Sequence, residues 1–253
     1  MTKRPSSAPL LQSPTPAPLP APSIADLLIR PTAFFEQLRA LPPSAGRYLW
    51  LVALASVVSG VSTTILARHV LGAQSSILSG AAGGSAISPL FNYGAAAFAS
   101  VFVTVLLWLA LWGLGALGAG PAGRAAEVYG AAFLPTLIWA VVLLPVALFF
   151  APQVAVAAPN LSGLSGAALQ KTVQAYILQV QAASSGDPVN TVTTWLGYAV
   201  YLWQFALAFV GFRVLTGQPN KAWRGVLYPL ALLLVLAAAA WLASKSVGSL
   251  LGG

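Results

Sequence analysis

The chain has 253 residues, of which 58% are hydrophobic and only 6% are charged, and its formal net charge is +8. Soluble domains have about a quarter of their residues charged, so this composition excludes an ordinary water-soluble enzyme. The chain has no Cys and one His, His69, which excludes disulfides and thiolate chemistry and argues against metal sites and catalytic triads. We therefore expect no metal, no cofactor and no enzymatic activity.

Long uncharged stretches separate the clusters of charged residues, and they range from 20 to 55 residues in length. A bilayer core requires about 20 apolar residues per helix. The apolar stretches predict five transmembrane helices, near residues 48–67, 91–117, 128–151, 194–215 and 226–243. The stretch 72–89, rich in Gly, Ser and Ala, is predicted to be a loop. The predicted fold class is an all-α polytopic membrane protein with short amphipathic interfacial helices.

Lys and Arg are distributed unequally between the two sides of this five-span arrangement. Three of them fall on one side: Arg68, Lys171 and Lys245. Nine fall on the side of the N-terminus: Lys3, Arg4, Arg30, Arg39, Arg47, Arg124, Arg213, Lys221 and Arg224. Positive loops stay in the cytoplasm, which predicts a multi-pass inner (cytoplasmic) membrane protein with a cytoplasmic N-terminus and an external C-terminus. Cations dispersed in this way indicate anionic lipid as a partner and do not indicate nucleic acid.

The part of the chain before the first span divides into two segments. Residues 1–22 hold seven prolines and are predicted to be a disordered cytoplasmic tail. Residues 23–47 form a cytoplasmic amphipathic segment, with a capping box at Ser23 and Asp26 and a second short helix opened by Pro31. Its apolar face is predicted to lie in the headgroup layer. Three of its residues are alternatively a docking surface for a cytosolic partner: Phe34, Phe35 and Leu38.

Residues 48–243 form the predicted transmembrane domain, and residues 244–253 a short C-terminal tail. The outer loop 152–193 contains an amphipathic pattern that predicts a helix on the outer surface. One face of that helix is apolar: Leu169, Val173, Tyr176, Ile177 and Val180. The third span contains Pro135 and Pro145, which are predicted to kink or interrupt it. A kinked span also favours an alternative function, a small-solute or ion permease subunit.

Two short motifs suggest chemistry but lack the context that it requires. Gly113, Gly115 and Gly118 satisfy G-x-G-x-x-G, yet they end an apolar helical run instead of following a strand, so they are interpreted as sites of close helix packing. Ser165 lies in a G-x-S-G sequence similar to that of rhomboid-type intramembrane proteases. The sole His, His69, precedes Ser165 by two predicted spans, whereas the base of rhomboid-type enzymes lies on a helix after the Ser, which makes an intramembrane enzyme a distant third hypothesis.

Two stretches together resemble the Yip domain family of Ypt/Rab-interacting, five-span membrane proteins. Tyr129, Gly130 and Pro135 match a Tyr-Gly pair followed by a Pro in the third span. Asp26, Arg30 and Pro31, followed by two Phe residues, are similar to the segment before the first span in prokaryotic members.

The resemblance implies a non-enzymatic membrane protein that acts as a scaffold, organises the membrane or recruits partners. It implies lipid, other membrane or cytosolic proteins, and a second copy of the chain as partners. Eukaryotic members carry Asp-Leu-Tyr-Gly-Pro before the first span. Other residues follow Asp26-Leu27 here, so GTPase binding is not carried over.

Overall fold

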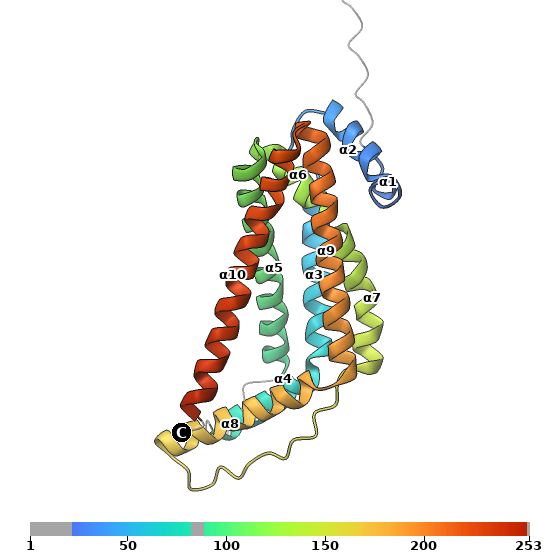
Figure 1. Cartoon of the computed structure of the whole chain (residues 1–253). Helices are drawn as coiled ribbons and strands as arrows, with labels where there is room; N and C mark the ends of the chain where they lie inside the picture. The colour runs from blue at the N-terminus through green and yellow to red at the C-terminus, as the bar shows by residue number, and fades with distance from the viewer. Residues whose placement is uncertain (1–21, 82–88, 252–253) are drawn as a thin grey trace, which may run out of the picture.

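The computed structural model of the chain describes residues 22–81 and 89–251 (Figure 1). The described residues form helices and no strand. In chain order they are α1 (Ile24–Ile29), α2 (Pro31–Ala40), α3 (Leu49–Leu66), α4 (Arg68–Ala81), α5 (Pro89–Ala119), α6 (Ala122–Ala132), α7 (Leu134–Phe150), α8 (Gly166–Ser185), α9 (Pro188–Thr216) and α10 (Pro219–Leu251). The all-α prediction is confirmed.

Five segments are long and apolar enough to cross a membrane. They are Leu49–Leu66, Leu90–Ala119, Ala122–Phe150, Pro188–Thr216 and Pro219–Ala239. Each overlaps one of the five predicted spans, so the chain is a multi-pass membrane protein. The outward sides of these helices carry large apolar side chains such as Phe98, Phe149 and Leu202, which is how lipid-facing surfaces are composed.

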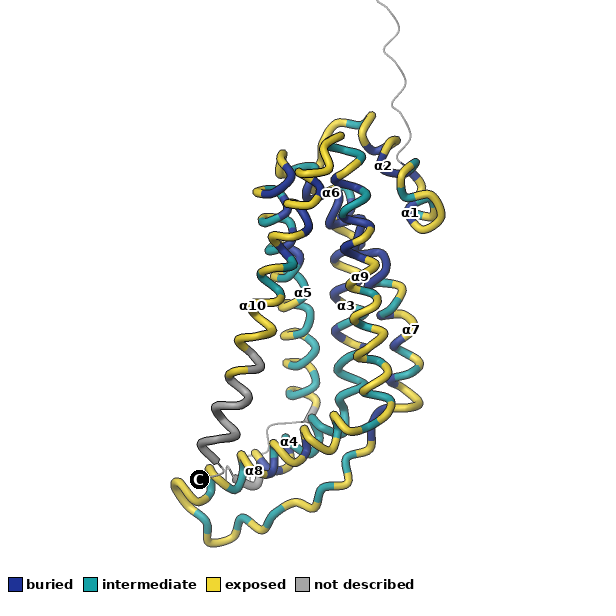
Figure 2. Tube along the Cα trace, in the orientation of Figure 1, coloured by how far each residue is buried: buried dark blue, intermediate teal, exposed yellow. Residues whose placement is uncertain are grey.

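The spans run side by side, and different helices occupy the two ends of the bundle (Figure 1). We call the end formed by α1, α2, the start of α6 and the α9–α10 turn the N-terminal face. The end crossed by α4 and α8 is the opposite face. Buried residues are concentrated towards the N-terminal face, whereas much of the length of α10 is exposed (Figure 2). The protein core therefore lies around α6, and lipid must cover the rest of the spans.

Helix ends follow from local sequence. The side chain of Asp187 accepts a hydrogen bond from the backbone N–H of Val189 at 2.8 Å, and Pro188 occupies the first turn of α9. Both features satisfy the free N–H groups of a helix start. At the other end of α9, Gly217 has φ +65°, a left-handed conformation that glycine adopts without strain and that commonly ends helices.

The prediction of a loop at residues 72–89 is wrong over most of its length, because α4 extends to Ala81. Residues 82–88 of that stretch lie outside the described residues. The weak mean hydropathy of this stretch argues against a transmembrane span, but it does not argue against a helix that lies at the membrane interface. Ile77 of α4 packs with Tyr176 and Val180 of α8 in a small separate apolar cluster. The structure has the predicted helix of the loop 152–193 as α8, with its apolar face packed in this cluster.

The third span is interrupted, and it consists of two helices that meet at Phe133. Pro135 is the second residue of α7. Its ring excludes the carbonyl four residues earlier and its nitrogen donates no hydrogen bond, so a helix breaks just before such a position. Pro145 lies inside α7 with its ring exposed.

One predicted boundary falls elsewhere. α10 continues to Leu251, so residues 244–251 extend the last helix instead of forming a separate tail. The predicted Pro-rich tail, residues 1–22, lies almost wholly outside the described residues. Trp108 is only 5% exposed and stacks on Trp112 at 5.2 Å between ring centroids. It packs in the core.

Candidate functional site at the N-terminal face

α6 is the centre of the best-packed region of the protein. Every residue from Ala125 to Ala132 is buried, and six of the eight are Ala, Gly or Val. Small side chains allow neighbouring helices to approach closely, and α6 contacts α3, α5, α7 and α9. The two large residues, Glu127 and Tyr129, make its specific contacts.

Tyr129 joins three other spans. Its ring lies over Gly115 of α5, where an added Cβ would be 2.4 Å from Cε2 of Tyr129. It meets Phe212 of α9 edge to face, with 5.5 Å between ring centroids. Its hydroxyl donates a hydrogen bond to the carbonyl of Gly225 in α10 at 2.7 Å. The adjacent Gly130 leaves room for Tyr48, because a Cβ added at Gly130 would lie only 3.0 Å from the Cβ of Tyr48.

Glu127 is a fully buried carboxylate with three partners. Oε1 lies 3.0 Å from Nη1 of Arg47 and accepts a hydrogen bond from the backbone N–H of Ser44 at 3.0 Å. Oε2 accepts a hydrogen bond from Nη1 of Arg124 at 2.9 Å. A buried charge is tolerated only when it is paired and hydrogen-bonded in this way.

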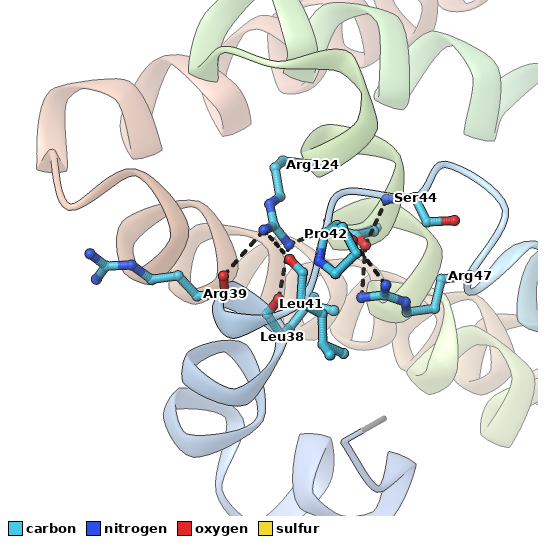
Figure 3. A network of polar contacts seen from close by, with 8 residues as sticks. Leu38, Arg39, Leu41, Pro42, Ser44, Arg47 and Arg124 are labelled. Carbon is cyan, nitrogen blue, oxygen red and sulfur yellow. Dashed lines mark hydrogen bonds and ion pairs between the residues drawn. The ribbon is translucent and has the colours of Figure 1, made fainter. Parts of the chain in front are cut away.

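The two arginines continue the network into the backbone before α3 (Figure 3). Arg124 donates to the carbonyls of Leu38 at 2.9 Å, Arg39 at 3.3 Å and Leu41 at 2.6 Å. Arg47 donates to the carbonyl of Pro42 at 2.9 Å. The last carbonyls of a helix need such donors. We call Glu127, Arg124 and Arg47 the linker clamp, because together they fix the end of α2 and the connection to α3.

The inner face of α2 is packed against the bundle. The predicted docking residues Phe34, Phe35 and Leu38 are fully buried. An added Cβ at Gly211 of α9 would lie 2.8 Å from the ring of Phe35. This corrects the prediction that these three side chains form an exposed surface or lie in the headgroup layer: the end of the bundle covers them. Any docking by this segment must use its other face.

Comparison with known families shows which family the chain belongs to. A model of the Yip1 domain matches residues 25–242, most of the chain. The chain belongs to the Yip1 domain family. No curated protein and no solved structure matches it. The Tyr-Gly pair that suggested the family is the pair that holds the Yip1 domain together at α6.

The second family-like stretch forms the hinge between α1 and α2 of the Yip1 domain. The carbonyl of Asp26 accepts a hydrogen bond from the backbone N–H of Arg30 at 2.7 Å, which ends α1. Arg30 is exposed, and Pro31 begins α2. Ser23 caps α1 in a simpler way than the predicted capping box, since its Oγ accepts a hydrogen bond from the N–H of Ala25 at 3.3 Å and not from that of Asp26.

Polar residues within the spans of the Yip1 domain connect helices. Oγ1 of Thr136 donates to Oε1 of Gln204 at 2.9 Å, which joins α7 to α9. On the opposite face, the guanidinium of Arg68 donates to the carbonyls of Ala147 and Leu148 at the end of α7. Gly118 is also a packing position, because an added Cβ there would lie 2.4 Å from the backbone of Arg224.

Sequence reasoning found one part of the linker clamp and missed the rest. Glu127 and Arg124 are three residues apart, a spacing that predicts a helical neighbour pair, and the two side chains do pair. The sequence contained no signal for the third partner, Arg47, or for full burial of the carboxylate. Gly130 and Tyr129 were singled out only by the family resemblance.

Proposed function

We propose that this Yip1-domain protein is a non-enzymatic scaffold of the inner membrane that recruits a cytosolic partner at its N-terminal face. One observation carries the proposal: the linker clamp and the buried face of α2 hold α1 and α2 in a single position on the end of the bundle. A surface that is ordered before binding loses little conformational entropy when a partner docks.

The charge distribution supports a cytoplasmic position for the N-terminal face. Seven of the basic residues in the described part of the chain belong to that end: Arg30, Arg39, Arg47, Arg124, Arg213, Lys221 and Arg224. Three belong to the opposite face: Arg68 begins α4, Lys171 lies in α8, and Lys245 lies near the end of α10. Positive residues resist translocation, so the proposed orientation places α1 and α2 in the cytosol.

The free face of α1 and α2 offers the partner both polar and apolar groups. On α2, Thr32, Glu36 and Arg39 are exposed. On α1, Ile29 is 75% exposed. Arg39 holds the clamp through its backbone carbonyl and not through its side chain. Its side chain is therefore available to a partner and can be replaced without disturbing the clamp.

The experiment is a cross-linking pull-down of the full-length protein from native membranes. We expect the double variant Glu36→Arg with Arg39→Glu to lose partners that the unmodified protein retains, because it reverses the charge pattern of the free face. Lys171→Gln, at the opposite face, is the matched control and should retain them. Identical partner sets in all three samples would contradict recruitment by this face.

A further inference from the structure

A cleft opens on the N-terminal face beside the linker clamp. Its volume is about 250 Å³, and four chain segments that are distant in sequence line it. Pro43 comes from the connection before α3, Gly120 and Pro121 from the α5–α6 turn, Thr216 from the end of α9 and Lys221 from the first turn of α10. Arg124 of the clamp also lines it. We call this cavity the headgroup cleft.

The headgroup cleft has a positive charge. Arg124 is paired with Glu127, but Arg47 shares the same carboxylate, so the clamp as a whole retains one positive charge. Lys221 is exposed and has no ion pair among the residues that the structure describes. Arg213 and Arg224 are exposed on the neighbouring turns but lie outside the lining of the cleft. No carboxylate lines the cavity, so an anion entering it meets cations on two sides.

Tryptophans place the headgroup cleft at the depth of lipid headgroups. Nε1 of Trp112 donates to the carbonyl of Ala122, next to Pro121 in the lining, at 2.7 Å. Trp223, two residues after Lys221, is half-exposed and packs on Phe209 with 4.6 Å between ring centroids. Trp side chains prefer the boundary between hydrocarbon and water, where lipid phosphates lie.

We propose that the headgroup cleft binds a phosphate group, supplied by the headgroup of an anionic phospholipid. Basic pockets between transmembrane helices bind lipid headgroups by this chemistry. Lys221 provides an ammonium with no ion pair among the described residues, and it is the donor to the phosphate. Arg124 contributes positive charge, because both of its Nη atoms already donate their hydrogens within the clamp. Thr216 lines the rim, and its hydroxyl already donates to the carbonyl of Phe212. A single lipid bound here contacts α5, α6, α9 and α10 together. The inference does not depend on the scaffold function.

The test is native mass spectrometry of the full-length protein in detergent with equimolar dioleoylphosphatidylglycerol and dioleoylphosphatidylcholine. We expect one phosphatidylglycerol to be retained in preference. Lys221→Gln should lower that preference about fivefold, the effect of one cation beside an anionic headgroup. Lys221 is exposed, so its replacement should not affect folding.

Two controls separate a site from general attraction to a basic surface. Arg213→Gln removes an exposed charge from the same face outside the lining, and Lys171→Gln removes one from the opposite face. Both should retain the preference. An equal loss in Lys221→Gln and Arg213→Gln, or no loss in Lys221→Gln, would overturn the proposal.

A second arm identifies the source of the phosphate. Millimolar inorganic phosphate is added to the protein that has retained phosphatidylglycerol. Retention of the lipid assigns the cleft to the headgroup. If phosphate displaces the lipid from the unmodified protein but not from Lys221→Gln, the cleft is a site for soluble phosphate. That result would overturn the lipid as the source.

Discussion

The hydroxyl of Tyr129 and the carbonyl of Gly225 form a buried hydrogen bond of 2.7 Å that joins the third span to the fifth. Gly225 is itself closely packed, since an added Cβ would lie 2.9 Å from Ala119 of α5 and from Phe212 of α9. Water cannot replace Tyr129 as the donor in so tight a contact. Tyr129 is therefore needed for its hydroxyl as well as for its ring.

Tyr129→Phe should lower the free energy of unfolding by about 1 to 2 kcal/mol, because it leaves a buried carbonyl without its donor. Reversible unfolding in mixed micelles measures the change. Tyr228→Phe is the matched control, since Tyr228 is on the same helix as Gly225 and is 46% exposed; it should change the stability little. Equal stabilities for the two variants would contradict the role assigned to the hydroxyl.

Glu127→Gln tests the linker clamp. Glutamine still accepts a hydrogen bond from Ser44 but cannot balance Arg47 and Arg124, and breaking a buried ion pair costs about 3 kcal/mol or more. The backbone of α2 and the following connection should become less stable than the spans. We expect amide hydrogen exchange in residues 34–47 to accelerate at least about tenfold, as local opening predicts, while exchange in α3 and α9 changes less.

The control for this exchange measurement is Glu36→Gln. Glu36 is exposed on α2, and its replacement also removes one negative charge from the N-terminal face. Its exchange pattern should match that of the unmodified protein. Faster exchange in this control, or unchanged exchange in Glu127→Gln, would show that the clamp does not hold the segment.

Tyr48 is a buried phenol whose hydroxyl has no hydrogen-bond partner among the residues that the structure describes. Burial raises its pKa from 10.0 to about 12. The folded state therefore holds the proton more tightly than the unfolded state. The contribution of Tyr48 to the free energy of unfolding is therefore fully present below pH 10, and it is lost as the pH rises from about 10 to about 12.

Tyr48→Phe should remove that decline without loss at neutral pH. Deleting an unpaired buried hydroxyl is neutral or stabilises by about 1 kcal/mol. Comparing the pH dependence of unfolding for the variant and the unmodified protein isolates Tyr48, because every other titrating group is common to both. A variant that is clearly less stable at pH 7 would indicate a partner for the hydroxyl.

The parts of the fold that sequence predicted depend on properties of single segments. A bilayer sets a minimum apolar length, so the spans were visible, and the 3.6-residue period revealed the buried face of α8. The same period in α2 showed an apolar face but not what covers it. Headgroups and the end of a helix bundle impose the same pattern, and only the tertiary fold shows that Phe35 packs on Gly211.

The candidate site was less predictable because its contacts join distant positions. Ser44 and Glu127 are 83 residues apart, and Tyr129 and Gly225 are 96 apart. α4 was missed for a different reason: mean hydropathy distinguishes a span from water but not an interfacial helix from a loop. The headgroup cleft requires four segments to meet, which no single stretch of sequence encodes.

The permease alternative rests on the prolines of the third span and has its own test. Pro145→Ala restores a backbone N–H four residues after Val141 and should strengthen α7. If the protein is a scaffold, liposomes that contain it should take up solute no faster than empty liposomes. The same should hold for liposomes that contain Pro145→Ala. A measurable flux that collapses in Pro135→Ala or Pro145→Ala would contradict the scaffold proposal and favour a permease.

Orientation can be tested with single cysteines, because the chain contains none. A reporter inserted at Gly123 would disturb the clamp region, since a Cβ there already lies 3.2 Å from Pro43. Glu36→Cys and Gln218→Cys introduce exposed thiols at the N-terminal face, and Ser162→Cys and Ser185→Cys lie beyond the third span, on the outer loop and at the end of α8.

If the basic residues keep the N-terminal face in the cytoplasm, as proposed, a membrane-impermeant maleimide should label the second pair in intact spheroplasts. The first pair should react only after lysis. Labelling of Gln218→Cys in intact cells would invert the topology and place α1, α2 and the headgroup cleft outside, where neither a cytosolic partner nor the lipids of the inner leaflet could reach them.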